Sequence, residues 1–117
     1  MAHTNVEIED QYACKTEAEP VVVSVIIGDG NPGAFLVFLD RKLKGANKTS
    51  SLGKPKAIKG KKTIVSATVT DEMDETNWTS VTVIYQEGDN RTAFGPYSKE
   101  VAKNLDTVGF IIKISNT

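Results

Sequence analysis

The segment from Lys61 to Gln86 constrains the fold most, because apolar and polar residues alternate along two stretches of it. The apolar sides of the two stretches consist of Val65, Ala67 and Val69 and of Val81, Val83 and Tyr85. A two-residue period is that of a pleated strand, in which successive side chains point to opposite faces. The segment therefore predicts two β-strands, joined by an acidic turn at residues 71–77.

Two apolar exceptions indicate how these strands pair. Ile64 and Ile84 lie on the polar sides of their stretches. An antiparallel hairpin that places Val65 opposite Val83 also places Ile64 opposite Ile84, so one register accounts for both exceptions. We therefore expect the two strands to be neighbours in one sheet.

Strand patterns also occur before and after this segment. Val6 to Tyr12 alternates with acidic residues, as suits an edge strand, and Val21 to Ile27 is apolar on both sides, as suits a central one. Ala34 to Leu39 and Val108 to Ser115 are predicted to be strands for the same reasons. Residues 42–62 predict a long basic loop with one or two short strands, around Leu52 and around residues 57–58. Residues 98–104 fit a strand, which we prefer, or a short helix.

Seven or eight short strands without a clear helix predict an all-β fold. We expect a single domain over residues 1–117, with residues 1–5 as a flexible tail, because a chain of 117 residues forms one core. The predicted architecture is an antiparallel β-sandwich of immunoglobulin-like or jelly-roll-like type, with a small barrel as second choice. The expected core consists of Val23, Val25, Ile27, Phe35, Val37, Leu39, Val65, Ala67, Val69, Val81, Val83, Tyr85, Phe110 and Ile112.

Composition excludes several classes of function. Lys and Arg number 14 against 15 Asp and Glu, so the overall charge does not direct the chain to nucleic acid or to an anionic membrane. Cys14 is the only cysteine, which rules out an internal disulfide and a thiolate metal cluster. No signal-like start and no long apolar run occur, so we expect a cytoplasmic protein, with release by a signal-independent route left open.

The sequence offers little for catalysis. His3 is the sole histidine and lies in the expected tail, so a Ser–His or Cys–His relay has no base. Residues 28–33 match the glycine pattern of a dinucleotide-binding turn. That turn needs a following helix and an acidic residue about twenty positions later, yet no acidic residue lies between Asp40 and Asp71. We predict a hairpin loop there and no enzymatic activity.

The acidic turn and the tryptophan beside it are the candidate binding residues. The expected register places Trp78 beside Thr70, on a side rich in Ser and Thr. An exposed indole there would suit stacking on a sugar ring or anchoring a partner, whereas a covered one would close the core. Both readings remain open. The candidate set is Thr70, Asp71, Asp74, Glu75, Asn77, Trp78 and Tyr97.

Calcium is the cofactor that the acidic turn could accommodate. Hard cations take several carboxylate and carbonyl oxygens, but the spacing of an EF-hand loop is absent. Further ligands would have to come from another loop, such as Asp29 and Asn31 or Asp89 and Asn90. We therefore expect a solvated turn without a cofactor, with calcium as the alternative.

These observations favour a non-enzymatic interaction or assembly module that acts through strand edges and loops. The acidic first strand and the basic central stretch are opposite in sign, which suits another protein or copies of the chain itself as partner. The lysines of residues 54–62 lack interleaved aromatic residues for base stacking, and we interpret them as a basic edge that blocks aggregation. The alternative function is a carbohydrate-binding module, assisted by calcium, that uses Trp78 and the acidic loops to bind a glycan.

Overall fold

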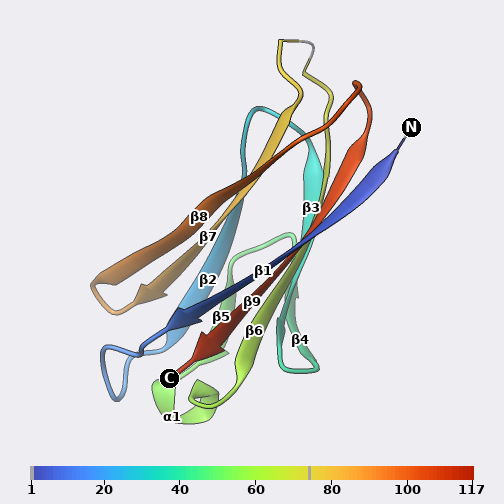
Figure 1. Ribbon diagram of the computed structural model, residues 1–117. Helices are drawn as coiled ribbons and strands as arrows, with labels where there is room; N and C mark the ends of the chain where they lie inside the picture. The colour runs from blue at the N-terminus through green and yellow to red at the C-terminus, as the bar shows by residue number, and fades with distance from the viewer. Residues whose placement is uncertain (1, 74) are drawn as a thin grey trace.

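The computed structural model of the chain describes residues 2–73 and 75–117. It shows two facing β-sheets, formed by strands in which apolar residues alternate with polar ones (Figure 1). The five-stranded sheet has the order β1 (His3–Tyr12), β9 (Thr107–Asn116), β6 (Lys62–Thr70), β3 (Gly33–Leu39) and β4 (Lys42–Ala46). The four-stranded sheet has the order β5 (Ser50–Gly53), β2 (Val21–Ile27), β7 (Trp78–Glu87) and β8 (Asn90–Glu100). A short helix, α1 (Pro55–Ile58), connects β5 to β6. The predicted β-sandwich is thus confirmed, and the sheets do not close into a barrel.

The core lies between the two sheets. Every residue expected in the core is buried there or packs against it from a half-buried position. The cluster also contains residues that the sequence did not single out: Tyr12, Val21, Leu52, Ile58, Phe94, Val101, Val108 and Ile114. Three aromatic rings meet at one side of it, with Tyr12 and Tyr85 centred 4.5 Å apart and Tyr85 and Phe94 centred 5.2 Å apart.

The predicted hairpin between β6 and β7 is wrong, because these strands belong to different sheets. Val65 pairs with Val37 of β3 and with Ile112 of β9, whereas Val83 pairs with Val25 and Phe94. Residues 71–77 cross from one sheet to the other. Alternation shows which side of a strand is buried. It does not show whether a second strand with the same pattern lies beside the first in one sheet or faces it across the core, because the buried side is the same in both cases.

Several other segments differ from expectation, in full or in part. Residues 28–33 join β2 and β3, which lie in opposite sheets, so they form a crossing loop and not a hairpin loop. Residues 57–58 are helical, because Pro55 suits the first turn of a helix and Ile58 is buried as its anchor. Of residues 98–104, for which we preferred a strand, residues 98–100 complete β8, whereas residues 101–104 are neither strand nor helix. Strand β1 begins at His3, within the expected tail, and runs parallel to β9.

A buried carboxylate fastens the loop between β1 and β2 to the sandwich. Glu87, the last residue of β7, accepts hydrogen bonds from the Tyr12 hydroxyl (2.5 Å), the Lys15 N–H (3.0 Å), and the Thr16 N–H (2.6 Å) and hydroxyl (2.7 Å). Burial opposes ionisation of Glu87, but these hydrogen bonds outweigh it and lower its pKa to about 2. The carboxylate is therefore ionised and paired, and it orders residues 13–16.

The molecule is elongated along its strands, with extents of 46 × 26 × 20 Å. The upper end, as drawn in Figure 1, carries the connections at residues 28–32, 71–77 and 101–106. The lower end carries residues 13–20, the β3–β4 turn, α1 and the β7–β8 turn.

Candidate functional site

The residues predicted to bind a ligand do not form one surface. Thr70 ends β6 in the five-stranded sheet and pairs with Thr107, whereas Trp78 begins β7 in the four-stranded sheet and pairs with Glu100. The predicted neighbourhood of Thr70 and Trp78 is therefore wrong, for the same reason as the hairpin. Tyr97 shares the inward side of its sheet with Val81, opposite to the side of Trp78.

The remaining members of that set differ in exposure. Glu75 is exposed and Asn77 is half-buried, while Asp71 is fully buried although it was expected on a solvated turn. Asp74 lies outside the described residues. Trp78 is 46% exposed, so of the two readings left open for it, the exposed indole holds. The Tyr97 hydroxyl donates to the Asp10 carboxylate at 2.8 Å and so links β8 to β1.

The most distinctive surface of the molecule is a basic depression at the lower end. Its volume is about 700 Å³, and it is open to solvent. Its floor is lined by Leu39, Leu52 and Ala57, of which Leu39 and Leu52 are almost fully buried in the core. The charged side chains around it are Asp40, Arg41, Lys42, Lys44 and Lys61. We refer to this surface as the basic depression.

The local fold explains why these cations surround the depression. Asp40 and Arg41 form the two-residue turn between β3 and β4, and Asp40 adopts a positive φ of 51°, which aspartate tolerates better than most residues. The Asp40 N–H donates to the Lys62 carbonyl at 2.7 Å, and the Lys62 N–H donates to the Asp40 carboxylate at 2.9 Å. These bonds tie the turn to β6, so Arg41 and Lys42 are held at the rim.

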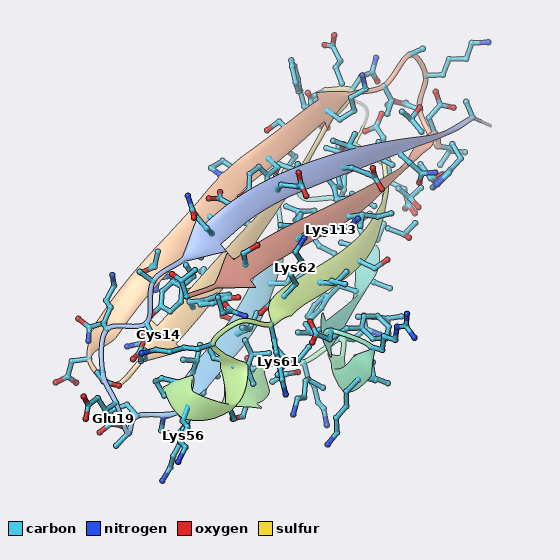
Figure 2. All side chains as sticks on the ribbon, turned by 60° about the horizontal axis from the view of Figure 1, so that its bottom comes forward. Cys14, Glu19, Lys56, Lys61, Lys62 and Lys113 are labelled. Carbon is cyan, nitrogen blue, oxygen red and sulfur yellow. The ribbon has the colours of Figure 1, made fainter. Side chains whose placement is uncertain are left out.

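Helix α1 separates the basic depression from a second one. Pro55 and Ile58 are buried, which leaves Lys56 and Lys59 exposed. The second depression, of about 410 Å³, is lined by Pro55, Lys56, Lys59 and the acidic Glu17. Figure 2 shows Lys56 and Lys61 projecting from the segment around α1. The basic depression is the more strongly positive of the two, since it has four cations and one carboxylate, whereas the second has two lysines and one carboxylate.

The cations of the basic depression have no acidic partner. Among the described residues, Arg41, Lys42, Lys44 and Lys61 form no ion pair. At the upper end the exposed acidic residues are Asp29, Glu72, Glu75 and Glu100, with Lys99 and Lys103 as the exposed cations. The lower end also carries exposed acidic residues, Glu17, Glu19, Asp40 and Asp89, but its exposed lysine and arginine residues outnumber them, although the formal net charge is only −1.

An apolar surface lies next to the basic depression, on the outer face of the five-stranded sheet. Phe38 pairs with Ile64 and Leu43, and Leu36 lies two residues before Phe38 on β3. Leu43 is 53% exposed. Lys62 and Lys113 lie on the strands beside these residues, as Figure 2 shows. This apolar face and the basic depression meet at the β3–β4 turn, so one partner can contact both surfaces.

The sequence contained only part of the signal for this site. The lysine-rich stretch is plain in residues 54–62, but we interpreted it as an edge that blocks aggregation. That interpretation is wrong, because residues 54–61 form α1 and its flanks, and Lys62 begins β6, a central strand of its sheet. Arg41, Lys42 and Lys44 join Lys61 only because β4 folds back beside β3. That pairing could have been inferred from the two-residue Asp40-Arg41 turn.

Comparison of the chain with protein-family models, with curated proteins and with solved structures finds no match. In the described part of the chain, no helix is long and apolar enough to cross a membrane.

Proposed function

We propose that this protein is a non-enzymatic interaction module whose basic depression binds an acidic segment of another protein. The observation that supports it is the combination of four unpaired cations in one open depression with exposed leucines on the sheet face beside it. Cations accelerate association with an acidic partner and select against basic ones. Leu39 and Leu52 are already buried, so further apolar burial comes from the exposed Leu43 and Leu36 on the adjoining sheet face. Such burial contributes about 25 cal/mol for each Å² removed from water.

An acidic protein segment fits this surface better than a nucleic acid does. The residues that form the floor are Leu39, Leu52 and Ala57, none of which offers an aromatic ring for base stacking. A peptide, in contrast, can place carboxylates at the cations and an aliphatic side chain on the exposed Leu43 beside them. The expected ligand is therefore a segment in which acidic and aliphatic residues alternate.

Charge reversal tests this proposal. We expect Arg41→Glu combined with Lys42→Glu to weaken binding of a fluorescent Glu/Leu peptide at least about tenfold, which corresponds to 1.4 kcal/mol. The matched control, Lys99→Glu with Lys103→Glu at the upper end, should change the affinity less than about twofold. Fluorescence anisotropy between about 50 and 300 mM NaCl should show weaker binding at higher salt.

Two results would count against the proposal. One is equal weakening by the two double variants, because binding would then reflect the overall charge alone. The other is tighter binding of a single-stranded oligonucleotide than of the peptide. Light scattering on the same samples decides whether a second copy of the chain is the partner. If the protein forms salt-sensitive oligomers that the Arg41/Lys42 variant does not form, the acidic segment belongs to another copy of this chain.

Trp78 supports a second candidate function, carbohydrate binding. Its indole is nearly half exposed on the outer side of the four-stranded sheet, where it can stack on a sugar ring. On a glycan array, Trp78→Ala should abolish any signal that the unaltered protein gives, whereas Leu43→Ala should preserve it. Because the indole is exposed, Trp78→Ala should alter the free energy of unfolding by less than about 1 kcal/mol. An array without signal would remove this candidate.

A further inference from the structure

The carboxyl group of Asp71 is buried without any partner. Its residue is 0% exposed, and neither side-chain oxygen accepts or donates a hydrogen bond. Buried polar groups in folded proteins are almost always paired, and an unpaired carboxyl group is costly to remove from water. A bound cation is one of the few ways to offset that cost.

Two further oxygen-bearing side chains are buried close to Asp71. The Asp71 N–H donates to the Asp106 carbonyl at 3.0 Å, so the two aspartates are neighbours across the end of the β6–β9 pairing. Asp106 is 5% exposed. The Asn31 amide oxygen accepts the N–H of Glu72, the residue after Asp71, at 3.0 Å. The three side chains come from the three connections of the upper end.

The hydrogen bonds of Asp106 and Asn31 fix their positions. The Asp106 carboxylate accepts the N–H groups of Ala2 (2.8 Å) and Lys103 (3.1 Å), and each oxygen keeps a free lone pair. The Asn31 amide also donates to the Trp78 carbonyl at 3.0 Å. Of the three, Asp71 alone has no donor, and Asp106, whose carbonyl group accepts the Asp71 N–H, carries a second carboxylate. Buried charges in proteins are paired or coordinate metals.

We infer that the upper end binds Ca²⁺, with Asp71 as its anchoring ligand and Asp106 as the second carboxylate. Ca²⁺ takes six to eight oxygen ligands in flexible geometry and accepts carbonyl and water oxygens beside carboxylates. Within the described residues, no three His, Cys, Asp or Glu side chains form a metal site. The remaining ligands are therefore main-chain carbonyl groups, the Asn31 amide oxygen and water. Mg²⁺ fits less well, because it demands strict octahedral geometry.

Calcium titration of the purified chain tests this inference. We expect CaCl₂ between about 0.01 and 10 mM to raise the melting temperature by roughly 5–10 °C at saturation, relative to excess chelator. Asp71→Asn should abolish this rise, and in chelator it should melt no lower than the unaltered protein, since a neutral amide costs less to bury unpaired. Glu72→Gln, an exposed acid on the same turn, should keep the full rise.

Two measurements do not depend on how the variant folds. Equilibrium dialysis of the unaltered protein should find one Ca²⁺ per chain. The fluorescence of Trp78, whose carbonyl is held by Asn31, should change over the same calcium range. No bound calcium, an equal rise in Asp71→Asn, or an equal rise with Mg²⁺ would overturn the inference.

Discussion

Replacing Glu87 with glutamine is expected to lower the free energy of unfolding by about 3 kcal/mol at neutral pH, because the loss involves hydrogen bonds to a buried charge. Four groups from Tyr12, Lys15 and Thr16 donate to its carboxylate. A glutamine amide places its own NH₂ against some of these donors and leaves them unpaired. Urea denaturation of the variant and the unaltered protein measures the difference.

The difference in stability between Glu87→Gln and the unaltered protein should become smaller as the pH falls. The pKa of Glu87 falls from 4.5 to about 2 on folding, so its stabilising effect is complete above about 4.5 and disappears as the pH falls towards 2. The two proteins should therefore converge in stability over this window. The control is Glu17→Gln, an exposed residue of the same loop, which should change stability by less than about 0.5 kcal/mol. A difference between Glu87→Gln and the unaltered protein that stays constant from pH 5 to about pH 2 would contradict the buried, ionised carboxylate.

Phe110→Ala is expected to cost about 4 kcal/mol of stability, equivalent to a melting temperature lower by about 15 °C. Phe110 is fully buried at the centre of the five-stranded sheet, where it pairs with Ala67 on one side and Val6 on the other. Ala67 is too small to fill the space that the ring would leave. Differential scanning calorimetry measures the effect directly.

The neighbouring residue provides the control for Phe110. Ile111 lies on the outer side of the same strand and is half-buried. Ile111→Ala should therefore cost no more than about 1.5 kcal/mol. Similar losses for the two variants would mean that the assignment of inner and outer sides along β9 is wrong.

Alternation along the chain was enough to predict which side chains form the core, but not which strands are neighbours. Val65 and Val83 both point inward, as expected. A residue with an inward side chain can pair within its own sheet or face the opposite sheet, and the period of two is the same in each case. The choice depends on whether residues 71–77 turn tightly or cross between sheets, which their composition does not specify.

The sequence also did not show which residues come together at the candidate surfaces. From the sequence, Asp71 was predicted to be the first residue of an exposed acidic turn. It nevertheless lies two residues after Val69 and so continues the two-residue spacing of the inward side chains Val65, Ala67 and Val69. That spacing was the available signal for its burial. The cations of the basic depression come from β4 and from the segment after α1, and only the folded chain brings them together.

The arrangement of the loops at both ends of the molecule depends on the placement of β6 and β7 in opposite sheets. Backbone NMR tests this placement most directly. We predict nuclear Overhauser effects from the backbone of Val65 to that of Val37 and of Ile112. None should join the backbones of Val65 and Val83, because facing sheets lie about 10 Å apart. Backbone effects between Val65 and Val83 would restore the hairpin and contradict the sandwich topology on which both proposed sites depend.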